Sequence, residues 1–112
     1  LLLGGGADVN QPKTDEFGTT PLFIAAEKGR SEIVSLLLVS GANIDQCTNK
    51  IGWSPLFVAA WFRHTEIVKV LLEIGADKAT VTTSAHGGME AGSTPLSAAT
   101  AKGHSEIVAL LE

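Results

Sequence analysis

Short apolar blocks recur along this chain in the same order, separated by polar turns. Each block opens on Pro-Leu, at Pro21, Pro55 and Pro95, and continues into a pair of alanines. A turn follows, then Ser or Thr, then Glu-Ile-Val, then a leucine-rich stretch. Proline suits the first position of a helix, and the Ile-Val and Leu-Leu pairs fall on one helical face. The pattern therefore predicts two short helices per block, joined by a turn and followed by a loop.

The blocks recur with a nearly fixed spacing. Pro21 and Pro55 are 34 residues apart. A period of this size indicates a solenoid, in which each unit stacks on the next. Pro55 and Pro95 are 40 residues apart, so the loop between the last two units carries extra residues. We expect this insertion, at about 81–88, to form a long and mobile finger loop.

Local signals mark the ends of the predicted helices. Hydroxyl side chains stand where helix N-caps are expected. The predicted caps are Thr20, Ser54 and Thr94 for the first helices and Ser31, Thr65 and Ser105 for the second helices. Gly29 and Gly103 suit the left-handed residue that ends a first helix. Arg63 occupies that position in the middle unit, where a left-handed backbone would cost roughly 1 kcal/mol.

In these features the chain resembles the ankyrin repeat family, whose signature includes T-P-L-H-x-A at a period near 33. Residues 20–25, 54–59 and 94–99 follow that motif, and residues 6–10 read G-A-D-V-N, like the exit of a preceding repeat. Phe or Ser replaces the usual His, so we expect apolar packing to hold the loops where Phe stands. The resemblance implies an all-α solenoid of stacked helix-turn-helix units with hairpin-like finger loops.

The resemblance also implies a domain organisation, namely one ankyrin-repeat domain over residues 1–112. Its expected parts are the tail of a preceding repeat with its exit loop (1–14), a full repeat (15–48), a full repeat with the insertion (49–88) and a truncated repeat (89–112). An inner repeat has apolar faces on both sides, and neither end of this chain offers a polar capping helix. We therefore expect a fragment of a longer array, monomeric within that array.

Composition and charge narrow the class of protein. Eight Lys and Arg against twelve Asp and Glu leave a net charge of −4, without a basic block, which argues against nucleic-acid binding. No apolar run approaches the length of a membrane span. A single cysteine, Cys47, excludes an internal disulfide framework and a Cys-rich zinc site. We expect an intracellular protein, in the cytoplasm, with the nucleus left open.

Candidate chemistry is sparse. His64 and His104 follow the turns between helices, where the resemblance implies a structural role, and His86 lies in the Gly-rich insertion. None has partners at metal-ligand spacing. The glycine clusters lack the strand, the Lys-Ser/Thr pair and the helix of a phosphate loop. Cys47 has no activating base in the sequence around it. We therefore expect no catalysis, no metal and no cofactor.

Partners of this family usually lie in the concave groove formed by the finger loops and the first helices. The positions that the resemblance assigns to this groove include several large apolar side chains, which are enriched in binding hot spots. The predicted partner-binding residues are Phe17, Lys50, Ile51, Trp53, Trp61 and Phe62. The predicted charged rim consists of Glu16, Glu27, Lys28, Lys50 and Arg63. The alternative is that the aromatic side chains pack on adjacent fingers.

The resemblance thus favours a protein-interaction module that binds a partner polypeptide of unknown identity through an exposed concave patch. Two other interpretations stay open. The chain could be the recruiting arm of a larger enzyme, such as a kinase or ubiquitin ligase, or it could be a structural spacer whose length matters more than its groove.

Overall fold

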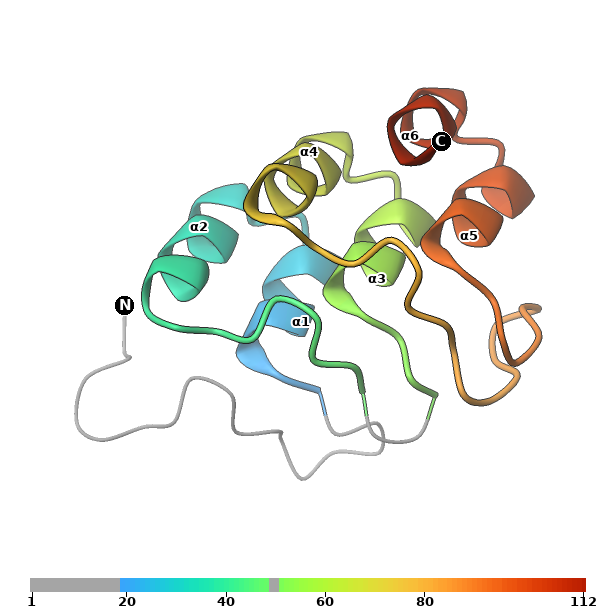
Figure 1. Cartoon of the computed structure of the whole chain (residues 1–112), viewed down its shortest axis with the longest axis horizontal. Coiled ribbons are helices and arrows are strands. Elements are labelled where there is room, and N and C mark those ends of the chain that lie inside the picture. The colour runs from blue at the N-terminus through green and yellow to red at the C-terminus, as the bar shows by residue number, and fades with distance from the viewer. Residues whose placement is uncertain (1–18, 49–50) are drawn as a thin grey trace.

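A computed structural model describes residues 19–48 and 51–112 and contains three helix pairs in that part of the chain (Figure 1). The helices are α1 (Pro21–Glu27), α2 (Ser31–Val39), α3 (Pro55–Trp61), α4 (Thr65–Ile74), α5 (Pro95–Lys102) and α6 (Ser105–Leu111). The first helices of the pairs, α1, α3 and α5, pack side by side in one layer, and α2, α4 and α6 form the second layer. The described residues form no strand, which confirms the predicted all-α stack. None of their helices is both long and apolar enough to cross a bilayer.

The first helices begin as the sequence predicts. In each, a hydroxyl oxygen accepts a hydrogen bond from the backbone N–H three residues later, which satisfies one of the unpaired donors of the first turn. The donor–acceptor pairs are Phe23 N and Thr20 Oγ1 (3.2 Å), Phe57 N and Ser54 Oγ (3.0 Å), and Ser97 N and Thr94 Oγ1 (3.1 Å).

The predicted caps of the second helices are wrong by one residue. The serines and threonine assigned as caps are the first helical residues, and the capping positions are Arg30, His64 and His104, which make no side-chain cap. Two of these side chains instead reach back to the preceding repeat. His64 Nε2 lies 2.8 Å from the carbonyl oxygen of Glu27, and His104 Nδ1 lies 2.9 Å from that of Ala60. A carbonyl oxygen only accepts, so each ring nitrogen donates, and the predicted structural role of both histidines is confirmed.

The turns between paired helices share one backbone conformation. Gly29 and Gly103 have φ of 75° and 73°, as expected for the left-handed position. Arg63 has φ of 63°, and it is the only non-glycine residue of the described chain with a positive φ. The middle turn is therefore not rearranged around Arg63, and this L-residue adopts the strained conformation.

The core lies between the two helical layers and is most complete in the middle repeat. Every residue of α3 from Pro55 to Ala60 is buried, because α3 has neighbours on both sides in its own layer. Phe23 and Phe57 stand where the family usually has His, and they are 5% and 1% exposed. The expected apolar packing at these positions is present.

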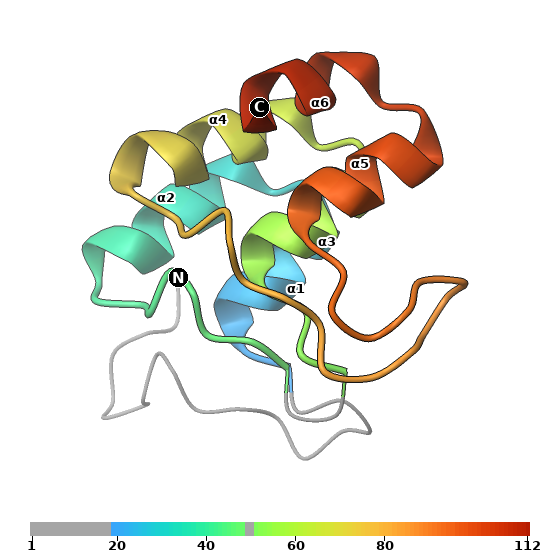
Figure 2. The same cartoon turned by 45° about the vertical axis from the view of Figure 1, so that its right-hand side comes forward.

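The loop between α4 and α5 contains the insertion, and we call residues 81–93 the insertion loop (Figure 2). Thr82 is buried at its base and organises it. The Thr82 N–H donates to the carbonyl of Ser93 (2.9 Å), and the Thr82 carbonyl accepts from Gly92 N–H (2.7 Å). The Thr82 hydroxyl donates to the carbonyl of Glu90 (3.0 Å) and accepts from Ser93 N–H (3.1 Å). These bonds join the two ends of the insertion loop and give it a defined shape.

Candidate functional site

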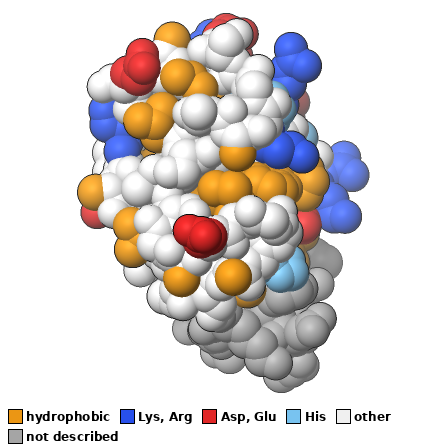
Figure 3. Space-filling view, turned by 90° about the vertical axis from the view of Figure 1, so that its right-hand side faces the viewer, with side chains coloured by type: hydrophobic (Ala, Val, Ile, Leu, Met, Phe, Trp, Pro, Cys, Tyr) orange, Lys and Arg blue, Asp and Glu red, His pale blue; other side chains and the backbone are white. Residues whose placement is uncertain are grey.

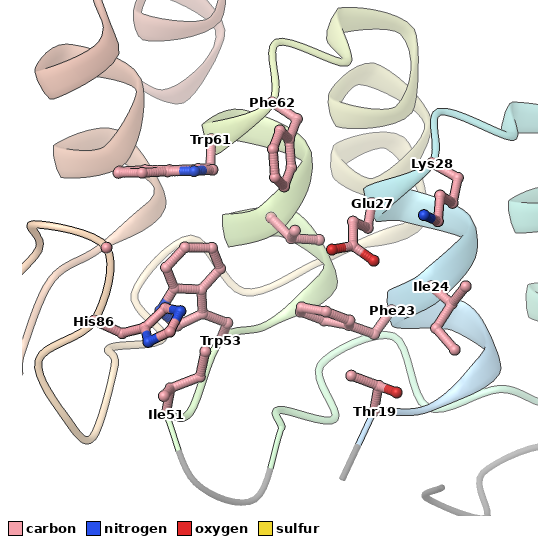
Figure 4. A pocket seen from close by; sticks show the side chains of 12 residues that line it. Thr19, Phe23, Ile24, Glu27, Lys28, Ile51, Trp53, Trp61, Phe62 and His86 are labelled. Carbon is pink, nitrogen blue, oxygen red and sulfur yellow. The ribbon is translucent and has the colours of Figure 1, made fainter. Parts of the chain in front are cut away.

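A groove opens between α1 and α3, where the finger loops meet the first helices (Figure 4). Its volume is about 390 Å³. Side chains and backbone from α1, from α3 and its C-cap, and from the loops surround it. The lining residues are Thr19, Phe23, Ile24, Glu27, Lys28, Ile51, Trp53, Val58, Trp61, Phe62, His86 and Gly87.

Four of the predicted partner-binding residues line this groove, but they do not form one exposed patch. Ile51 and Trp53 are 8% and 5% exposed, so the expectation of exposure is wrong for both. Trp61 is half-buried, and Phe62 is 48% exposed. The other two predicted residues, Phe17 and Lys50, lie outside the described residues. The exposed aromatic surface of the groove therefore comes from the end of α3.

Trp53 forms the floor of the groove. Its ring lies against Phe57 (4.6 Å between ring centroids) and Trp61 (5.4 Å), and His86 approaches it edge-on (5.7 Å). Its backbone N–H donates to the hydroxyl of Thr48 (3.1 Å). The Trp53 indole N–H is buried and has no acceptor among the described residues. Trp53 thus packs on the adjacent finger through His86, as the alternative expected, and also on α3 through Phe57 and Trp61.

The insertion loop closes one end of the groove. Thr83 N–H donates to the carbonyl of Ile51 (3.0 Å), which ties the insertion loop to the preceding finger. This contact needs glycine at position 52, because a Cβ on Gly52 would lie 2.8 Å from the Thr83 backbone nitrogen. Gly87 then lies against Trp61, since a Cβ placed there would be 3.6 Å from that ring. The insertion is thus part of the site.

Several lining residues escaped the sequence analysis. Phe23 was expected only to hold its loop by apolar packing, and Ile24 was given no role. His86 and Gly87 reach the groove only because the insertion loop folds back over Trp61. Nothing in the sequence indicates the direction in which an insertion of this kind folds.

Charged side chains flank the apolar surface. Glu27 is half-buried and Lys28 is exposed, both at the end of α1. The ammonium of Lys102, at the end of α5, lies 4.6 Å from the centre of the Trp61 ring, within the range of a cation–π interaction. Figure 3 shows a cluster of hydrophobic side chains on the face seen there, with basic side chains beside it. The groove therefore has an apolar centre and a cation on each side.

The described residues hold no group of three or more His, Cys, Asp or Glu side chains that could bind a metal ion. The Cys47 thiol is half-buried and donates to the carbonyl of Asp45 (3.5 Å). Burial, followed by the charge of Asp45, raises the pKa of Cys47. The thiolate is therefore disfavoured at neutral pH, which is the opposite of what an activated nucleophile requires.

Comparison with protein families gives one result. A family model of ankyrin repeats, in three copies, matches residues 1–82. The match contains α1 to α4 and ends at Thr82, within the insertion loop. A search of curated proteins found no match to the chain.

Proposed function

Because this chain belongs to the ankyrin repeat family, we propose that it is a non-catalytic interaction module that binds a partner polypeptide in the groove between α1 and α3. Ankyrin repeats in general are protein–protein interaction modules. The proposal assigns that role to one concave surface of this chain.

One observation carries the proposal, namely the exposure of Phe62 beside Trp61 at the mouth of the groove. Phe62 keeps 48% of its surface in water although it directly follows α3, the most buried helix of the stack. Aromatic side chains bind partners efficiently because they bury a large rigid surface with few rotatable bonds. A volume of about 390 Å³ falls in the range of ligand pockets, which begins near 300 Å³. A partner side chain could therefore enter beside Phe62.

The groove is also held in place before any partner arrives. Trp61 contacts Trp53 on one side and Gly87 on another, and Lys102 lies over its ring. Trp53 is in turn fixed by Phe57 in the core. Binding to a prearranged surface loses little conformational entropy, so more of the contact energy appears as affinity.

The burial of each side chain indicates which substitution tests the groove without unfolding the protein. Trp53→Ala would remove a buried ring and lower the free energy of unfolding by about 3–5 kcal/mol, so a loss of binding could not be told from a loss of folding. Phe62→Ala removes an exposed ring instead. Ile74→Ala is a matched control, because Ile74 is 54% exposed at the end of α4, outside the groove.

The experiment compares the native chain, Phe62→Ala and Ile74→Ala as baits in extracts, after circular dichroism shows equal helicity. A photo-crosslinking residue at position 62, and another at position 74, identifies what touches each site. We expect partners that crosslink at position 62 and are lost with Phe62→Ala but kept with Ile74→Ala. Equal capture by all three baits, with no crosslink specific to position 62, would contradict the proposal.

A further inference from the structure

We infer that the groove selects an extended acidic segment, in which one bulky apolar side chain is flanked by two carboxylates about five to six residues apart. This inference rests on the proposed function and specifies the chemistry of the partner. It follows from the positions of two lysines and one glutamate around the apolar centre.

The two lysines lie on opposite sides of the groove. Lys28 lines it from the end of α1, and Lys102 lies over Trp61 from the end of α5. Helix α3 packs between α1 and α5. Neighbouring helices pack with axes about 8–10 Å apart, so the axes of α1 and α5 lie roughly 16–20 Å apart. An extended chain rises about 3.3 Å per residue and needs about five to six residues to span that distance.

Both lysines are available to a partner. Each is exposed, and neither forms an ion pair with a carboxylate of the described residues. This local concentration of positive charge contrasts with the net charge of the chain, which is −4. Half of its eight cations stand at the ends of the first helices or in the turns after them, namely Lys28, Arg30, Arg63 and Lys102. The exposed acids of the second helices, Glu32, Glu66 and Glu106, do not line the groove.

Glu27 determines where the partner's charges can lie. Its half-buried side chain lines the groove beside Lys28, and Figure 4 shows the carboxylate pointing into the open space between Phe62 and Phe23. A second carboxylate placed there would be repelled, and partial burial makes that repulsion stronger than in water. The negative charges of the partner therefore belong at its flanks, over the lysines, and its centre must be uncharged.

The centre of the groove accepts an apolar side chain. Figure 4 shows Trp61, Phe62, Phe23 and Trp53 around the open space. The volume of about 390 Å³ is at the small end for a ligand pocket, which suits one bulky side chain with its backbone better than a folded element. The flanking charges would then fix the orientation of the segment and accelerate its association.

The test is a selection from a phage-displayed library of random twelve-residue peptides, with the full 112-residue chain as bait. We expect enriched peptides that carry a bulky apolar residue between two Asp or Glu residues about five to six positions apart. Lys28→Glu combined with Lys102→Glu should weaken the synthesised peptides about tenfold and should itself select peptides with Lys or Arg at the flanks. Lys69→Glu combined with Lys78→Glu makes the same change of charge outside the groove and should alter affinity less than twofold.

The other possible results refute either the acidic segment alone or both the acidic segment and the groove as a binding site. Peptides that lack the acidic pattern, lose affinity with Phe62→Ala and bind the Lys28 and Lys102 variant equally well would refute the acidic segment but leave the groove as a binding site. No enrichment, or enriched peptides indifferent to Phe62→Ala, would contradict both. Self-association of the chain that Phe62→Ala abolishes would identify a second copy as the occupant and overturn the inference.

Discussion

Replacing Arg63 by glycine should make this protein more stable. Arg63 has φ of 63° in the turn where the neighbouring repeats have Gly29 and Gly103. A left-handed backbone costs a non-glycine residue roughly 1–2 kcal/mol. Glycine in turn adds about 0.4–1 kcal/mol of unfolded-chain entropy. The Arg63 side chain is exposed and has no ion pair among the described residues, so its removal costs little. The difference leaves a gain of about 0.5–1 kcal/mol, or roughly 2–4 °C in Tm for a chain of this size.

The assay is urea unfolding, followed by circular dichroism and tryptophan fluorescence. Arg63→Gly should raise the midpoint with an unchanged m-value. Gly103→Arg makes the reverse change in an equivalent turn, and a Cβ there would meet nothing within 4 Å. It should therefore lose a similar free energy through backbone strain alone. Gly29 is a poor control, because its Cβ would lie 2.9 Å from the ring of His64.

The strain argument would be refuted if Arg63→Gly left the midpoint unchanged or lower. An unchanged Gly103→Arg midpoint would refute it equally, since that variant isolates the same backbone conformation. If Arg63→Gly raised the urea midpoint but also changed the m-value, the variant would have altered the unfolded state. The explanation by relief of backbone strain in the native turn would then be refuted.

Three further predictions concern single contacts. His104→Ala should destabilise the protein by about 1–2 kcal/mol in urea unfolding, because the Ala60 carbonyl loses its donor from the next repeat. Gly52→Ala should cost more than about 1 kcal/mol in the same assay, because the new Cβ would meet the Thr83 backbone at a positive φ, and an unchanged midpoint would mean that the two fingers are not in contact. Cys47 should react with iodoacetamide through a thiolate whose apparent pKa is higher in the native protein than in urea, because burial and a neighbouring carboxylate favour the neutral thiol; equal pH profiles would contradict this.

The sequence alone was sufficient for the starts of the first helices. Three signals mark each first helix: the proline at its start, the hydroxyl side chain before that proline, and the left-handed residue after the helix. Each of these signals depends only on residues that are close in the sequence. Thr20 and Gly103 could therefore be assigned without any knowledge of packing. The repeat period added the stacking order, because each unit has to bury its apolar face against the next. The second-helix caps were misplaced by one residue, and in α4 and α6 the capping position holds a histidine that bonds to a carbonyl 37 or 44 residues away instead of within its own turn.

The site was predicted only in part. The family resemblance placed Trp61 and Phe62 at the groove, and both line it. It could not show that Trp53 is a floor and not a contact surface, since that depends on how closely the finger packs on α3 and the insertion loop. The contributions of His86 and Gly87 depend on Thr82 folding the insertion loop back toward α3. Exposure is a property of neighbours brought together by tertiary packing. The repeat pattern therefore indicated that Trp61 and Phe62 reach the groove, whereas the tertiary structure added His86 and Gly87 and decided which side chains remain open to a partner.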